Sequence, residues 1–240
     1  MDEPVGTGVF HPSIRPYLHS VLNGYRMRIY HVDPEEPSPE AIVAAVEALR
    51  AGDLVILPTE TVYGLACDAQ NQLGVERIYS AKGRSERSPL PVQVAHAWQL
   101  RTVAEDIPEV ALRAAARFWP GPLTMVLRRR AGQFDALASG GDTIAVRVPR
   151  YAVPLAVLTE FDGPLAVTSA NVSGGPDAVT AEEAIAALGQ AVAVILEAGP
   201  SPIGHASTVL DVTGDKPRVL RQGSIAVQDL ERALEVEVES

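Results

Sequence analysis

Leu54-Val-Ile-Leu57-Pro58-Thr-Glu-Thr61 is the stretch that most clearly indicates the fold, because a short apolar run ends abruptly in polar residues. Four consecutive apolar residues are typical of a buried strand, and Pro58 ends it. Upstream, Ser38-Pro39-Glu40 provides an N-cap, a first-turn proline and an early acid for a helix over residues 41–50. A strand that runs into a polar turn is a common position for a binding site in α/β proteins.

The rest of the chain alternates between strand and helix patterns. We expect further strands at 90–94, 123–127, 143–148, 165–168, 191–196 and 208–212, and further helices at 75–81, 98–104, 108–119 and 180–188. This irregular alternation predicts a single α/β domain, with a twisted, open, mixed sheet and flanking helices. The domain is expected to span residues 27–225, after an N-terminal extension at 1–26 and before a C-terminal helix or tail at 226–240. The end of that tail, residues 235–240, is expected to be frayed rather than an edge strand.

The composition argues against several classes of protein. The 30 acidic residues outnumber the 20 Lys and Arg residues and give a net charge of −10, which disfavours broad binding of duplex nucleic acid but leaves a local RNA contact open. No apolar run reaches the roughly 18 residues of a membrane helix. Residues 1–4 do not resemble the start of a signal peptide, so we expect a cytoplasmic protein without a membrane partner.

The cysteine and histidine residues predict no metal centre. Cys67 is the single cysteine, which excludes an internal disulfide and a cysteine-rich zinc site. A buried, inert thiol is favoured over a nucleophile at this position. The 5 histidines are scattered, without the spacing of a metal-binding pair, so we expect no metal bound by protein side chains.

A local concentration of positive charge interrupts this acidic chain. Within residues 77–88, Lys82-Gly83-Arg84 could bring an ammonium and a guanidinium to one anion, although a solvated loop is the alternative. Arg147 lies inside the apolar run 144–148, where a charge needs either a structural ion pair or an anionic ligand. Arg221 ends a short strand, where it either overhangs a site or lies on the surface.

Small polar residues provide the other candidates. Ser169, Asn171, Ser173 and Gly174 form a turn that could hold a phosphate or a ribose, although most such turns are structural. Glu60 could act as a base, but an exposed or capping acid is the favoured interpretation. The sequence has no P-loop pattern GxxxxGK(S/T), no GxSxG elbow and no convincing Ser/His/Asp set.

Taken in order, these segments resemble the threonylcarbamoyl-AMP synthase family, the YrdC-like domain. The resemblance covers residues 27–225. Its motifs are Pro58-Thr-Glu-Thr-Val-Tyr-Gly-Leu65, Ala81-Lys-Gly-Arg84 with Pro89-Leu90, Phe118-Trp-Pro-Gly-Pro-Leu-Thr124, Ala145-Val-Arg-Val-Pro149, Thr168-Ser-Ala-Asn-Val-Ser-Gly174, Ser207-Thr-Val209 and Leu220-Arg221. The resemblance implies a twisted open sheet with a concave, positively charged cavity.

The resemblance also implies an activity and a set of site residues. L-threonine, bicarbonate and ATP would give threonylcarbamoyl-AMP and pyrophosphate, for the threonylcarbamoyladenosine modification of tRNA. Mg²⁺ would be carried by the phosphates, and the product would pass to a tRNA threonylcarbamoyl-transfer complex. By motif position, Lys82 and Arg84 would be catalytic and would contact ATP together with Ser88, Thr143, Asn171, Thr180 and Arg221. The residues that would contact L-threonine are Thr61, Arg147, Ser169 and Ser207.

Several positions depart from the family pattern. Ser88 and Gln93 stand where the family often has Asn and His, so the threonine end of the pocket could be altered. Ser85 and Gln222 stand where it often has Pro, and none of these changes removes a charge. Two alternatives remain: an RNA-binding module that holds tRNA in the same basic cavity, and the carbamoyl-transferring module of hydrogenase maturation. The acidic balance and few aromatics disfavour the first, and the single cysteine and modest length disfavour the second.

Overall fold

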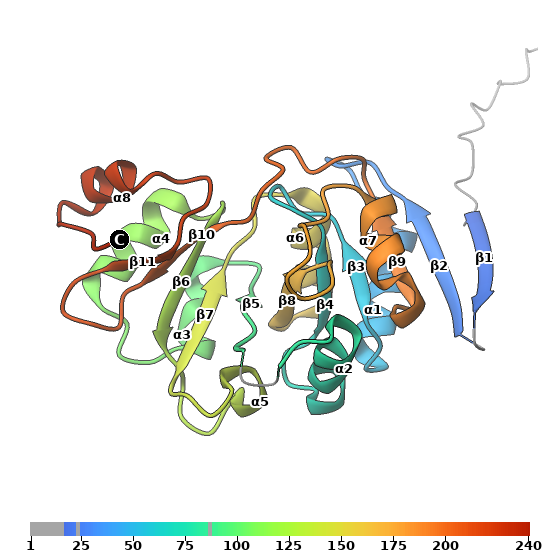
Figure 1. Ribbon diagram of the computed structural model, residues 1–240, viewed down its shortest axis with the longest axis horizontal. Helices are drawn as coiled ribbons and strands as arrows, with labels where there is room; N and C mark the ends of the chain where they lie inside the picture. Colours follow the sequence, from blue (N-terminus) through green and yellow to red (C-terminus); the bar gives the residue numbers. More distant parts are fainter. Residues whose placement is uncertain (1–16, 23–24, 86–87) are drawn as a thin grey trace, which may run out of the picture.

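The computed structural model describes residues 17–22, 25–85 and 88–240, whose strands form a single mixed sheet (Figure 1). The sheet has 11 strands in the order β1-β2-β9-β3-β4-β8-β5-β7-β6-β10-β11. The strands are β1 Tyr17–Leu22, β2 Tyr25–His31, β3 Val55–Leu57, β4 Gly64–Asp68, β5 Val92–Gln93, β6 Leu123–Arg128, β7 Thr143–Arg147, β8 Leu165–Ser169, β9 Val194–Glu197, β10 Thr208–Asp211 and β11 Arg218–Arg221. Parallel and antiparallel pairs both occur, so the predicted mixed sheet is confirmed.

Helices cover both faces of this sheet, as predicted. They are α1 Pro39–Arg50, α2 Gln72–Lys82, α3 Leu100–Val103, α4 Glu109–Phe118, α5 Asp135–Ala138, α6 Ala152–Phe161, α7 Ala181–Leu188 and α8 Val227–Leu234, with short 3₁₀ turns at Ala97–Gln99 and Gly189–Ala191. Strand β3 separates two apolar clusters, because Val55 and Leu57 face the cluster under α1 and α6 while Ile56 faces the other cluster. The second cluster is covered by α2, α4, α7 and α8.

Local signals account for the helix ends that the sequence predicts. Pro39 starts α1 as expected, and Ser38 occupies the N-cap position, but the Ser38 side chain makes no capping hydrogen bond. Thr180 caps α7 through a capping box, in which its Oγ1 accepts from the backbone N–H of Glu183 (3.3 Å) and the Glu183 carboxylate accepts from the backbone N–H of Thr180 (3.2 Å). The predicted helix at 75–81 is longer, because Asn71 caps it and the chain reverses at Gly83, whose φ of +58° suits glycine.

The register of the strands makes neighbours of residues that lie far apart in the sequence. The pairs that matter for the cavity are Gly64 with Ser169, Gln93 with Arg147, Val209 with Thr124, and Val209 with Arg221. Gly64 is required at its position, since a Cβ there would lie 2.7 Å from Cγ1 of Val167. These pairs connect neighbouring strands from β4 to β11, along the half of the sheet that ends at β11.

Five elements and one chain end differ from the sequence analysis. The patterns do not predict β1, β2 or α5, and β1 pairs with β2 in the sheet although it lies in the expected extension at 1–26. They also do not predict β4, whose glycine and alanine are weak strand formers, or α6, whose first turn contains Pro154. The prediction of a frayed end at 235–240 is wrong. Val238 is buried, and Glu239 forms two backbone hydrogen bonds, from Val219 N–H (2.7 Å) and to the carbonyl of Pro217 (2.9 Å). Residues 1–16 of the predicted extension lie outside the described residues.

Candidate functional site

A cavity of about 250 Å³ lies over one face of the sheet, beside the turn between β3 and β4. Its walls contain Thr59, Thr61, Val62, Tyr63, Gly64, Arg84, Pro89, Pro91, Gln93, Thr124, Ala145, Arg147, Val167, Thr168, Ser169, Ala206, Ser207, Val209 and Arg221. Many of these residues recur two positions apart along a strand, because alternate side chains of a strand face the same side. The polar strand ends identified in the sequence thus converge on one site.

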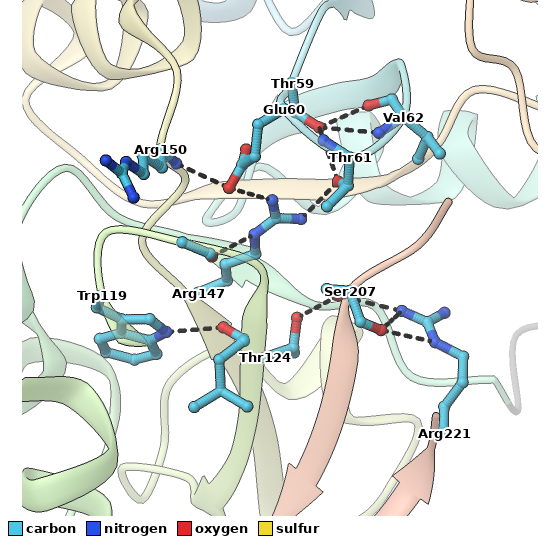
Figure 2. A network of polar contacts seen from close by, with 12 residues as sticks. Thr59, Glu60, Thr61, Val62, Trp119, Thr124, Arg147, Arg150, Ser207 and Arg221 are labelled. Atoms are coloured by element: carbon cyan, nitrogen blue, oxygen red, sulfur yellow. Dashed lines mark hydrogen bonds and ion pairs between the residues drawn. The ribbon is translucent and has the colours of Figure 1, made fainter. Parts of the chain in front are cut away.

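Arg147, the last residue of β7, is a buried cation with a partner for each of its nitrogens (Figure 2). Its Nε donates to the carbonyl of Gly121 (3.1 Å), and its Nη1 donates to Oγ1 of Thr61 (2.9 Å). Its Nη2 lies 2.7 Å from Oε1 of Glu60, at ion-pair distance but without the alignment of a hydrogen bond. Arg147 therefore combines the two roles that the sequence left as alternatives, since it forms an ion pair and also lines the cavity.

The hydroxyl groups of Thr59 and Thr61 form a directed chain beside Arg147. Oγ1 of Thr59 donates to the carbonyl of Val62 (2.6 Å), so the proton of Thr59 is already used. In the 2.9 Å contact between the two hydroxyls, Thr61 must then be the donor. With its proton given to Thr59, Oγ1 of Thr61 can only accept hydrogen bonds from Arg147 and from a ligand.

Glu60 is a buried acid behind the cavity wall, which corrects the interpretation of it as an exposed or capping acid. The residue is only 5% exposed. Oε1 pairs with Arg147 and accepts from the backbone N–H of Arg150 (2.9 Å), whereas Oε2 has no hydrogen-bond partner in the described part of the chain. The carboxylate offsets the charge of Arg147, without which burial of that guanidinium would be costly.

Arg221 and Thr124 both hold Ser207, at the opposite side of the cavity (Figure 2). Nη2 of Arg221 donates to the carbonyl of Ser207 (2.9 Å) and to its Oγ (3.2 Å), while Oγ1 of Thr124 lies 2.8 Å from Oγ of Ser207. Arg221 is exposed as a whole residue, yet partial burial of its guanidinium lowers its pKa, and the positive charges of Arg147 and Arg84 act in the same direction. Asp177 opposes this lowering of the Arg221 pKa.

Lys82 lies behind the wall rather than in it, and its ammonium is bonded to the turn after β8. Nζ donates to the carbonyls of Ser169 (2.5 Å) and Asn171 (2.6 Å) and to Oδ1 of Asn171 (3.1 Å). The residue is only 2% exposed. Burial, with a smaller effect of Arg84, lowers the pKa of its ammonium to about 8.

Arg84 differs from Lys82 and Arg147, because its guanidinium has few protein partners. Nη2 donates to the carbonyl of Pro89 (3.0 Å), and Nε is buried without a hydrogen-bond partner among the described residues. Burial lowers the pKa of Arg84. A buried donor without a partner is costly, so this guanidinium is well suited to accept an anionic ligand from the cavity.

The structure brings together six of the candidate site residues in the cavity wall, namely Thr61, Arg84, Arg147, Ser169, Ser207 and Arg221. Five others lie outside this lining, within the part of the chain that the structure describes. Lys82 and Asn171 lie behind Ser169. The carbonyl of Ser88 accepts a hydrogen bond from the Tyr79 hydroxyl (3.0 Å). Thr143 is the first residue of β7, and Thr180 caps α7. Their roles toward a ligand stay predictions.

Sequence reasoning did not select Thr59 or Thr124 as wall residues, although both lie in the family motifs. Thr124 follows the Pro120-Gly-Pro122 turn at the start of a strand, and this position could have indicated that it lies at the site. Gln93, which stands where the family often has His, lines the cavity, in agreement with its expected place in the pocket. Its Oε1 is buried and has no hydrogen-bond partner in the described chain, so the cavity offers an acceptor there.

The sheet and its cavity define an α/β protein with a cationic ligand pocket over an open sheet. The chain belongs to the Sua5/YciO/YrdC family, whose model, described as "Telomere recombination", matches residues 47–223. It is 40% identical over 208 residues to a Mycobacterium tuberculosis (strain ATCC 25618 / H37Rv) relative, a match that covers 87% of this chain and 95% of the relative. The predicted family resemblance is confirmed.

Two further comparisons concern Pyrococcus abyssi. Its threonylcarbamoyl-AMP synthase (strain GE5 / Orsay) is 39% identical over 186 residues, which are 78% of this chain and 55% of that protein. The solved structure of P. abyssi Sua5 complexed with L-threonine is similar with a TM-score of 0.84 and 37% identity, over 88% of this chain and 62% of that chain. This chain thus spans little more than half of the archaeal relative.

No helix within the described residues is long and apolar enough to cross a membrane. No group of three or more His, Cys, Asp or Glu side chains in the same residues is arranged to hold a metal ion.

Proposed function

We propose that this protein joins L-threonine, bicarbonate and ATP to give threonylcarbamoyl-AMP and pyrophosphate. The observation that carries the proposal is the convergence of Arg84, Arg147 and Arg221 on one cavity. Three guanidinium groups suit a ligand that carries several negative charges. A relative that is 39% identical bears the name threonylcarbamoyl-AMP synthase, which supports the same activity here.

Thr61, Arg147, Ser169 and Ser207 are the proposed contacts for threonine. Arg147 is fixed by Gly121, Thr61 and Glu60, and its remaining N–H groups suit a carboxylate. Oγ of Ser169 donates to Oδ1 of Asn171 (2.7 Å), so Ser169, like Thr61, offers only lone pairs to a ligand. Acceptors beside a guanidinium match the amino and carboxylate groups of an amino acid. The L-threonine complex of P. abyssi Sua5 supports threonine as the ligand.

Arg84 and Arg221, both in the cavity wall, are the proposed contacts for the phosphates of ATP. Lys82 is also proposed to act on the phosphates of ATP. Ser88, Thr143, Asn171 and Thr180 complete the nucleotide site on the family pattern alone.

The proposed reaction needs alignment rather than a protein nucleophile. The threonine nitrogen bonds to the carbon of bicarbonate and water leaves, which gives a carbamate. A carbamate oxygen then bonds to the α-phosphorus of ATP while the bond from that phosphorus to the bridging oxygen breaks, and pyrophosphate leaves. Positioned cations stabilise the charge of this transfer. Mg²⁺ would enter with the phosphates and assist the leaving group.

The product is a labile mixed anhydride, so it requires an acceptor close at hand. We propose that it passes to a complex that transfers the threonylcarbamoyl group to tRNA. The cytoplasmic location expected from the sequence is part of this proposal.

Release of pyrophosphate tests the proposal directly. We expect release only when ATP, bicarbonate and threonine are all present, with threonylcarbamoyl-AMP detected by mass spectrometry. Release that is unchanged without threonine would overturn the assignment. The alternative of an RNA-binding module would be revived by salt-sensitive tRNA binding that Lys82→Ala abolishes, in a protein without nucleotide turnover.

A further inference from the structure

Lys82 is a buried cation whose hydrogen bonds all go to one short turn. An ammonium has three N–H donors, and those of Lys82 have three acceptors within 3.1 Å, on Ser169 and Asn171. No carboxylate lies within ion-pair distance of Nζ in the described chain, whose ion pairs involve other residues. The ammonium is therefore held by dipoles of the turn rather than by an opposite charge.

The same turn is tied to Lys82 through the backbone as well. The backbone N–H of Ser173 donates to the carbonyl of Lys82 (2.9 Å). Within the turn, Nδ2 of Asn171 donates to the carbonyl of Gly175 (2.7 Å). Lys82 thus joins the end of α2 to the turn 169–175, which follows β8 and is about 90 positions away in the sequence.

One consequence of this arrangement reaches the cavity. Oδ1 of Asn171 accepts from Lys82 and also from Oγ of Ser169 (2.7 Å). Ser169 lines the cavity, while Lys82 and Asn171 do not. The position of Asn171 Oδ1 sets the direction of the Ser169 hydroxyl, and Lys82 helps to set the position of that oxygen.

We infer that Lys82 is a positioning residue, which orients the Ser169 hydroxyl toward the amino group of threonine through Asn171, in addition to any contact it makes with the nucleotide. The inference rests on the proposed function for the identity of threonine as the ligand. Its geometric part, the bond between Lys82 and the turn, does not depend on that function.

Threonine binding without nucleotide separates this role from a role on phosphates. Lys82→Met keeps an unbranched side chain and removes the ammonium. By isothermal titration calorimetry with L-threonine alone, we expect its affinity to fall by at least about tenfold, the effect of leaving buried acceptors without a charged donor. The control is Lys216→Met, which removes an exposed lysine paired with Glu237 and should leave the affinity unchanged.

A double-mutant cycle shows whether the effect passes through Ser169. Ser169→Ala and Lys82→Met should each weaken threonine binding, and the double variant should be little weaker than either single variant. Additive losses would overturn the inference, as would wild-type threonine affinity in Lys82→Met. A variant that merely misfolds is recognised by its circular dichroism and thermal melt.

Hydrogen exchange keeps the result interpretable if the wild-type protein does not bind threonine at all. That outcome would refute the proposed function, and the exchange of residues 169–175 would then decide on Lys82. We expect faster exchange there in Lys82→Met than in Lys216→Met, without any ligand. Equal exchange in the two variants would refute the positioning role.

Discussion

Arg147 and Arg84 line the same cavity, but their surroundings differ sharply. The guanidinium of Arg147 has a carbonyl, a hydroxyl and a carboxylate as partners, and its residue is buried. The guanidinium of Arg84 donates to the Pro89 carbonyl, and its buried Nε has no hydrogen-bond partner among the described residues. The difference shows that Arg147 is held in place before a ligand binds, whereas Arg84 has a donor that a ligand can still satisfy.

The strongest way to break this comparison is to remove the acid behind Arg147. Glu60→Ala leaves a buried guanidinium and the backbone N–H of Arg150 without their acceptor. We expect a loss of about 3–5 kcal/mol in the free energy of unfolding, measured by urea denaturation. Glu160→Ala, at an exposed acid on α6, is the control and should change stability by less than about 0.5 kcal/mol. A loss of the control's size in Glu60→Ala would mean that Arg147 does not need its counter-charge.

The second test concerns Arg84, where the effect should appear in turnover. Arg84→Gln removes a cation that does not hold the wall together, so we expect an unfolding free energy within about 1 kcal/mol of wild type. Pyrophosphate release should fall about 100-fold to 1,000-fold, as when one donor to a developing charge is removed. Stopped assays with saturating ATP measure this loss in kcat. A large loss of stability with little loss of turnover would reverse the roles of the two arginines.

A third test sharpens the status of Thr180, which lies outside the cavity lining. Thr180→Ala breaks the capping box with Glu183 and should cost about 1 kcal/mol of stability. Thr180→Ser keeps a hydroxyl and should be close to wild type. If Thr180 also contacts ATP, as the family pattern predicts, the KM for ATP will rise in Thr180→Ala beyond what the stability loss explains. An unchanged KM would restrict Thr180 to capping.

The fourth test is a dependence of stability on pH at Lys82. Burial lowers the pKa of its ammonium from the usual 10.5 to about 8, an effect that Arg84 adds to and Asp177 opposes. Between these values the unfolded chain binds a proton that the folded chain does not, so stability should rise with pH there. The urea midpoint of wild type, relative to that of Lys82→Met, should therefore increase from pH 8 to pH 10.5. A flat difference would place the pKa of Lys82 near its usual value.

Sequence reasoning predicted the elements that carry local signals. The caps of α1 and α7 are short patterns, which can be recognised without knowledge of the rest of the fold. Strand β4 and helix α6 have weaker local patterns, and their stability comes from pairing and packing with distant segments. The packing of Gly64 against Val167, for example, joins positions that no local pattern relates.

The same distinction holds for the site. The charges at Arg84, Arg147 and Arg221 were recognisable, because cations beside glycines or inside apolar strands are unusual. The burial of Lys82 was not recognisable from the sequence, because the acceptors of its ammonium, on Ser169 and Asn171, are distant along the chain. The burial of Glu60 was also hidden, because its neighbours Thr59 and Thr61 are polar and its partners, Arg147 and the backbone N–H of Arg150, lie far along the sequence.

The dispersed register of the sheet has a consequence for how the protein is made. Arg147 depends on Gly121, Glu60 and Thr61, and Ser207 is held by Arg221. During synthesis, the early strands must therefore wait for residues near the C-terminal end before the cavity can close. A growing chain that has not yet released Arg221 from the ribosome therefore has an incomplete cavity wall.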